Sequence, residues 1–285
     1  MFNNGLYFQR TTPSYSYFLN TYPGASQAYS FRKLSSTYTG FCCRIINRTS
    51  GLTQDIGFVN NFVDTASIIS FTGVNICDII IMYDQSGNAR DTTFTVNFRP
   101  RICNNGALFY ESGNLVGSGA VNRIQGTFTP YAMTDISVFI THNVVGVGSY
   151  AGYYTNRATS QKGVLITSNA GSSWQSSLIP LNTSGTEVTG RLKSRSSIKS
   201  TPTGLYIENW IYNDATNSHD LEETGISVGL TNSLTGWGTI TNLGRWGGNA
   251  GNGLQHNFCE MIIYDSDQSA NKTAINNEIK TFYGL

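Results

Sequence analysis

The stretch Ile79-Ile80-Ile81-Met82-Tyr83-Asp84-Gln85-Ser86-Gly87-Asn88 joins an apolar run to a compact polar turn. Its apolar first half, mostly β-branched, predicts a strand that is covered on both faces. The Asp-Gln-Ser-Gly-Asn segment after it supplies side chains that bond to nearby backbone groups in turns. We therefore predict a buried strand followed by a turn in which Asp84, Ser86 and Asn88 have a structural role.

The composition of the 285-residue chain indicates a mainly β protein. Its 30 glycines, 16 tyrosines and 15 phenylalanines fit many short strands joined by tight turns. Charged residues make up only 12% of the chain and the net charge is +1, so we expect no nucleic-acid partner. No apolar run approaches the roughly eighteen residues of a membrane-spanning helix, so we expect no membrane insertion.

The cysteines and histidines do not form a recognisable metal or disulfide motif. The five cysteines are an odd number without a C-x-x-C pair, which favours free thiols buried in strands; they are Cys42, Cys43, Cys77, Cys103 and Cys259. The three histidines are far apart in the sequence, so a zinc site or a Ser-His-Asp triad would require a coincidence of tertiary structure; they are His142, His219 and His256. We expect no metal and no cofactor.

The pattern of residues predicts an N-terminal arm and one large domain. Residues 1–18 show neither helical nor alternating periodicity, which suits an arm that orders against a partner, and residues 19–285 read as one domain. We expect helices near 23–35, 65–71 and 269–283, with Ala66 and Ile69 of the second facing inward and Ala274, Ile275, Glu278, Ile279 and Phe282 of the third packing on the sandwich. The expected strands are 94–98, 107–110, 137–142, 152–156, 163–167, 186–195, 205–212, 226–230 and 257–265. This spacing predicts an antiparallel sandwich of two sheets.

Two regions resemble known families. The segment Leu19-Asn20-Thr21-Tyr22-Pro23-Gly24-Ala25, the later Thr53-Gln54-Asp55-Ile56-Gly57-Phe58 and the turn at Asp84 occur in the order found in the α-L-arabinofuranosidase B family of glycoside hydrolases. Residues 19–91 carry this resemblance, which many phage proteins share. The segment Leu254 to Asp265 with the helix after it resembles the end of concanavalin A-like, laminin-G-like sandwiches. The resemblance thus implies a concanavalin A-like (jelly-roll) sandwich with a few short helices.

A glycosidase requires two carboxylates placed across the scissile bond. The arabinofuranosidase family carries its catalytic glutamate in a Met-Glu-(apolar)-Tyr-Phe-Gly-Asn context, and no segment of this chain matches it. Glu208 and Glu260 are the candidates that we keep, because each lies on an expected strand whose pleat could aim it into a concave face. The alternative is that each faces solvent from an antiparallel strand. From this reasoning we expect a protein that is not an enzyme.

Sugar-binding sandwiches use exposed aromatic rings flanked by groups that form hydrogen bonds. Trp237 and Trp246 lie in two separate glycine-rich segments, where a large ring has little local packing. Asn249 lies in the same segment as Trp246, Gly244–Gly253. These three residues are the candidates for ligand binding. The alternative is that both rings close the end of the sandwich or pack against another subunit.

Several features together resemble virion proteins of tailed phages. Met1-Phe2-Asn3-Asn4-Gly5 begins no secretory signal, so we expect synthesis in a host cytoplasm and release within a virion. The resemblance implies a head or tail fibre or a decoration protein, a homo-dimer or homo-trimer in contact with other virion proteins and with host cell-surface glycans. The alternatives are a glycoside hydrolase or depolymerase for arabinose-containing or capsular polysaccharide, and a lectin.

Overall fold

The computed structural model describes residues 16–119, 124–146, 151–155, 163–170, 174–181, 193–195, 204–215, 218–223, 226–231, 240–246 and 255–285. The helices are α1 (Phe18–Thr21), α2 (Thr65–Thr72), α3 (Lys272–Tyr283) and the 3-10 helix η1 (Val96–Phe98). The strands of the first half are β1 (Gln27–Ser30), β2 (Cys43–Asn47), β3 (Thr53–Ile56), β4 (Phe58–Val59), β5 (Phe62–Val63), β6 (Cys77–Met82), β7 (Thr92–Phe94), β8 (Arg101–Asn104), β9 (Ala107–Leu108), β10 (Tyr110–Glu111), β11 (Asn114–Leu115), β12 (Gly117–Ser118) and β13 (Gly126–Met133). Those of the second half are β14 (Ile136–Gly146), β15 (Ala151–Thr155), β16 (Gly163–Ala170), β17 (Trp174–Leu181), β18 (Lys193–Arg195), β19 (Tyr206–Asn213), β20 (Ser218–Glu223), β21 (Ile226–Thr231), β22 (Ile240–Trp246) and β23 (Gln255–Tyr264).

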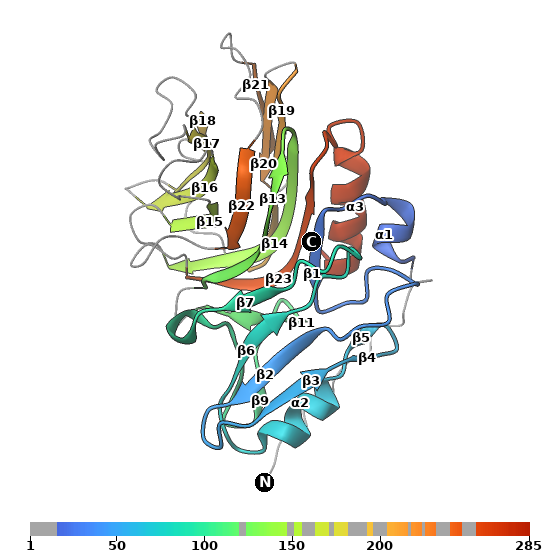
Figure 1. The fold of residues 1–285 in the computed structure, drawn as a ribbon, viewed down its shortest axis with the longest axis vertical. Coiled ribbons are helices and arrows are strands. Elements are labelled where there is room, and N and C mark those ends of the chain that lie inside the picture. The colour runs from blue at the N-terminus through green and yellow to red at the C-terminus, as the bar shows by residue number, and fades with distance from the viewer. Residues whose placement is uncertain are drawn as a thin grey trace.

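The strands form a mainly β, antiparallel sandwich, as the sequence predicts. Nineteen of them are hydrogen-bonded into one continuous sheet that bends over on itself, and two short hairpins, β4–β5 and β10–β11, complete the set. In Figure 1, β14 and β23 cross the middle of the molecule, with β13 and β19–β22 above them and β2, β3, β6 and α2 below. Helix α3 lies beside β23, and α1 lies on the far side of α3.

Strand β14 lies in the centre of a three-stranded part of the sheet. It pairs with β19 on one side and β23 on the other, and Ile140 lies directly opposite both Glu208 and Met261. Directly opposed residues point to the same face of a sheet, and their chain neighbours point to the other. Away from the register shifts at Thr141–His142 and Val144–Gly146, the register therefore assigns the residues of these strands to one of two faces.

The two faces bury different cores. We call the first the inner face; its Val138, Ile140, Trp210 and Met261 pack in one cluster with residues of β7 and β13, including Phe94 and Phe128. We call the second the helix face; its Phe139, Ile207 and Ile262 pack with Ile275 and Ile279 of α3. The final helix is thus confirmed, and it covers one side of the β19–β14–β23 sheet.

The turn after β6 ties that strand to β1. Asp84 accepts hydrogen bonds from the backbone N–H groups of Ala28 and Ser86, both at 2.9 Å, and Asn88 donates to the carbonyl of Ala25 at 3.0 Å. The buried Gln85 amide donates to the carbonyls of Ser30 and Arg32 and accepts from the N–H of Leu34. The turn residues therefore bond mainly to a segment more than fifty positions earlier in the chain.

The predicted helix at residues 23–35 is wrong. This segment holds β1, which pairs antiparallel with β23 from Gln27 opposite Ile263 to Ser30 opposite Glu260. All four residues of β1 are buried, so the segment has no solvent side of the kind that an amphipathic helix needs. Its three- and four-residue apolar spacing arises because nearly every position is covered.

Other expectations need smaller corrections. Helix α2 forms where predicted, but Ile68 and Thr72 are its buried residues, while Ile69 is 43% exposed and Ala66 also faces solvent. The Asp64 carboxylate accepts the Ser67 N–H at 3.0 Å and so fixes where the helix begins. The expected strand at 94–98 ends at Phe94 and continues as η1.

Helix α3 buries Ile275 and Ile279 as predicted, together with Asn276 and Tyr283, whereas Ala274 is exposed. None of the helices in the described ranges is long and apolar enough to cross a membrane. All five cysteines are free thiols with buried side chains.

Candidate functional site

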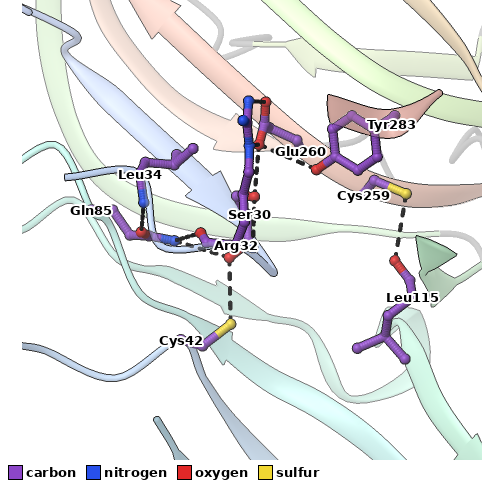
Figure 2. A network of polar contacts seen from close by, with 9 residues as sticks. All are labelled: Ser30, Arg32, Leu34, Cys42, Gln85, Leu115, Cys259, Glu260 and Tyr283. Atoms are coloured by element: carbon purple, nitrogen blue, oxygen red, sulfur yellow. Dashed lines mark hydrogen bonds and ion pairs between the residues drawn. The ribbon is translucent and has the colours of Figure 1, made fainter. Parts of the chain in front are cut away.

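Glu260, the first of the two carboxylate candidates, lies on the helix face in a closed ion pair. The Arg32 guanidinium donates from Nε and Nη2 to its two carboxylate oxygens at 2.7 and 2.8 Å, and the hydroxyls of Ser30 and Tyr283 donate to Oε2 at 2.7 and 3.2 Å. The side chains of Arg32 and Glu260 are each 1% exposed. Figure 2 shows the carboxylate enclosed by these donors, so the contacts assign it a structural role.

Glu208, the second candidate, lies on the inner face beside two histidines. His142 Nε2 is 3.2 Å from Glu208 Oε2, and His142 Nδ1 is 3.5 Å from His256 Nδ1. The three residues come from β19, β14 and β23, which are adjacent in the sheet. All three side chains are buried, with Glu208 3% exposed.

The two candidates cannot act together on one substrate. Glu208 and Met261 are both opposite Ile140 and therefore lie on the inner face, and Glu260 precedes Met261 on β23. Alternation of side chains places Glu260 on the other side of the sheet. The carboxylate pair of a glycosidase must flank one bond from a shared site, so Glu208 and Glu260 do not form such a pair.

The strand register aligns a second glutamate with Glu208. Glu223 of β20 lies directly opposite Glu208 of β19. Directly opposed residues of an antiparallel pair have Cβ atoms about 4.5–5.5 Å apart and share a face. Four neighbouring strands, β23, β14, β19 and β20, thus carry His256, His142, Glu208 and the backbone position of Glu223 in turn.

Burial determines the charge of the two imidazoles. Loss of hydration lowers the pKa of His142 to about 3, despite the Glu208 carboxylate beside it. Burial also lowers the pKa of His256 well below its ordinary value, and His142 adds to that shift. Both rings are therefore neutral at pH 7. In the tautomer that donates Nε2–H to Glu208, His142 presents Nδ1 as an acceptor toward His256.

The ligand candidates lie largely outside the described residues. Trp237 and Asn249 are not within them, and Trp246 is described only as the last residue of β22. Its backbone position pairs with Gly126 and Tyr154. In the ranges that the structure describes, no three or more His, Cys, Asp or Glu side chains are grouped to hold a metal ion.

Sequence reasoning missed the histidines of this site. His142 and His256 are 114 positions apart, yet they make a ring contact with centroids at 5.7 Å. The sequence did indicate that each histidine lies in an expected strand or next to one. It did not indicate that the two strands are neighbours. Only the pairing of β14 with β23 brings the two strands together.

Comparisons with known proteins show a likeness of fold to solved structures. No family model matches the sequence, and no curated protein matches it. Among solved structures, a GH54 α-L-arabinofuranosidase soaked with a cyclic sulfate inhibitor is similar over 88% of this chain, with a TM-score of 0.60 and 15% sequence identity. An arabinofuranosidase complexed with arabinofuranosyl-α-1,2-xylobiose gives a TM-score of 0.58 at the same identity. The chain spans 62% of the length of both structures.

These comparisons correct the expectation that the protein is not an enzyme. The arabinofuranosidases that share its fold are glycoside hydrolases, and the shared fold extends over 88% of the chain rather than over residues 19–91 alone. The argument from a missing Met-Glu context failed because it considered one local motif, whereas the fold likeness concerns the whole sandwich. The likeness concerns the fold, and the chemistry performed on it must be argued from this chain's own residues.

Proposed function

We propose that the protein is a glycoside hydrolase acting on arabinose-containing or capsular polysaccharide, with Glu208 and Glu223 as its carboxylate pair. The observation that carries the proposal is the register position of these two glutamates, directly opposite each other on β19 and β20 of a sandwich whose fold resembles that of GH54 arabinofuranosidases. Retaining glycosidases hold their two carboxyl groups about 5–5.5 Å apart. A directly opposed pair on neighbouring strands suits that spacing.

The histidines suggest a different role for each of the two glutamates. His142 contacts Glu208 and so orients its carboxylate, which suits the nucleophile, and His256 supports His142 through the Nδ1 contact. Glu223 would then protonate the leaving group and later activate water. Because Glu208 is 3% exposed, turnover requires the inner face to open around the sugar.

The test is release of sugar from 4-nitrophenyl α-L-arabinofuranoside and from arabinose-containing polysaccharide. Glu208→Gln and Glu223→Gln should each reduce kcat by about 10²-fold or more. Glu222→Gln is the matched control: it makes the same chemical change one residue away, at the register position opposite Asn209 instead of Glu208. We expect it to retain the activity of the unsubstituted protein.

Absence of sugar release by the correctly folded protein would overturn the proposal, as would equal loss in the Glu222→Gln control. Near-UV circular dichroism of each variant separates loss of chemistry from loss of folding. Glycan binding without release would favour the second candidate, a dimeric or trimeric component of a virion surface that binds host glycans. That candidate is supported by the resemblance of residues 19–91 to phage proteins.

A further inference from the structure

Two of the buried cysteines face each other across neighbouring strands. Cys77 begins β6 and lies directly opposite Cys103 of β8 in an antiparallel pairing. Directly opposed residues have Cα atoms about 4.5–5.5 Å apart, and a disulfide bridges Cα atoms about 4.4–6.8 Å apart. The backbone register therefore already meets the main geometric requirement for a bond between these residues.

The side chain of Thr72 lies beside this pair. Its Oγ1 is 3.1 Å from Cys77 Sγ. Burial raises the pKa of Cys103, hydrogen bonding to the same threonine opposes that rise, and Cys103 in turn adds to the rise that burial causes in the pKa of Cys77. The two thiols therefore share one buried environment.

We propose that Cys77 and Cys103 are a redox-active pair that closes into a cross-strand disulfide when the chain meets a low-molecular-weight disulfide such as oxidised glutathione. In the first step, the thiolate of one cysteine attacks a glutathione sulfur, which forms a mixed disulfide and releases one glutathione thiolate. The thiolate of the second cysteine then attacks the protein sulfur of that mixed disulfide and releases the second glutathione. The two thiol protons and two electrons end on two molecules of reduced glutathione.

The remaining cysteines lack such a partner in the described strand pairings. Cys43 is opposite Ile56 and Met82. The Cys42 thiol contacts the carbonyl of Ser30 at 3.4 Å, and the Cys259 thiol contacts the carbonyl of Leu115 at 3.5 Å on the helix face. Among the pairings that the structure defines, oxidation should therefore select Cys77 and Cys103.

Two turns pack against each other next to this pair. The backbone N–H of Gly106, after β8, donates to the carbonyl of Asn75 at 3.4 Å, and a Cβ at Gly106 would lie 2.7 Å from the carbonyl oxygen of Gly73. Gly106 also has a φ of +77°, which favours glycine. Burial raises the pKa of both thiols, so few thiolates form in the closed state. Oxidation is therefore expected during folding or after these turns separate.

The test uses the full chain refolded in a buffer of oxidised and reduced glutathione, followed by alkylation in denaturant and peptide mapping without reduction. We expect one bond linking the Cys77 and Cys103 peptides, an intact mass lower by two hydrogen atoms, and a melting temperature about 5–10 °C higher than that of the reduced protein. Cys103→Ser and Cys77→Ser should abolish both changes. Cys259→Ser is the matched control and should retain them.

Two outcomes would overturn the proposal. One is full alkylation of Cys77 and Cys103 after refolding in the oxidising buffer. The other is a bond that maps to a different pair, such as Cys42 with Cys43. Mapping of the unsubstituted protein decides the question even if a serine variant fails to fold.

Discussion

Arg32 and Glu260 form an ion pair that is shielded from water by aromatic rings. The Arg32 guanidinium carbon lies 4.1 Å from the centroid of Phe282 and 5.5 Å from that of Phe18. Removing one partner of a buried pair leaves an uncompensated charge in a medium that solvates it poorly. We expect Glu260→Gln to lower the free energy of unfolding by about 3–5 kcal/mol, measured by urea denaturation.

An exposed pair provides the control for that prediction. Arg44 and Asp55 are 2.6 Å apart, but their side chains are 39% and 23% exposed. Water already solvates both charges, so Asp55→Asn should lower the free energy of unfolding by about 1 kcal/mol or less. Equal effects of Glu260→Gln and Asp55→Asn would contradict the view that burial makes the first pair important.

His142 and His256 predict a pH dependence of stability. The folded protein keeps both imidazoles neutral because burial lowers their pKa, to about 3 for His142, while the unfolded chain protonates them near pH 6.5. The unfolded state therefore binds more protons at acidic pH, and stability decreases as the pH falls below about 6.5. Between about pH 7 and pH 5, each histidine should remove about 2 kcal/mol from the free energy of unfolding. Urea titrations at both values test this, and His256→Gln should reduce the difference by about half.

Sequence reasoning at single positions succeeded where the chemistry is local. Asp84 and Ser86 bond to each other two residues apart, at 2.7 Å between side chains, and a turn motif displays this directly. Reasoning from the sequence could not assign Glu208 and Glu260 to different faces of the sheet, because both are glutamates in expected strands. Their opposite faces follow from the pairing register with β14, which involves residues more than sixty positions away.

The side chain of Gln85 joins the turn after β6 to the end of β1 and the segment that follows it. Gln85 is 2% exposed and makes three hydrogen bonds to the backbone from Ser30 to Leu34. Gln85→Met keeps the length of the side chain but leaves these buried backbone groups without that partner. We expect a loss of about 2–4 kcal/mol in the free energy of unfolding.

Asn88 of the same turn is the matched comparison for Gln85. It also donates to the backbone, to the carbonyls of Ala25 and Ser26, but it is exposed. Water can replace its hydrogen bonds, so Asn88→Ala should lower stability by about 1 kcal/mol. A larger effect at Asn88 than at Gln85 would contradict the role given to the buried amide.

The elements that sequence patterns predicted well are those whose partners lie nearby or whose periodicity is unambiguous. Helix α3 combines Ile275 and Ile279 on one face with exposed residues on the other, and it was predicted correctly. Strand β1 was predicted as a helix because its four residues are all buried and thus show no alternation. Its partner β23 is more than two hundred residues away, so only the tertiary fold identifies it.

At the level of the whole molecule, the fold is closed by pairing its first strand with its last. Strand β1 pairs with β23 along its full length, and β23 also pairs with β12 and β14. Arg32, just after β1, is held by Glu260 of β23 and lies over the ring of Phe282 in α3. Strand β1 and Arg32 therefore depend on the last thirty residues for their ladder and counter-charge.

This closure predicts that residues 19–91 do not form an independent unit. A chain that ends at Gly119 lacks β23 and α3, which leaves β1 without its ladder and Arg32 without a counter-charge. We expect hydrogen exchange to show no long-lived protection of the β1 and β6 amides in this fragment, whereas the full chain protects both in a single cooperative event. Protection of β6 in the fragment equal to that in the full chain would show that the N-terminal region folds alone, and would divide the sandwich into two domains.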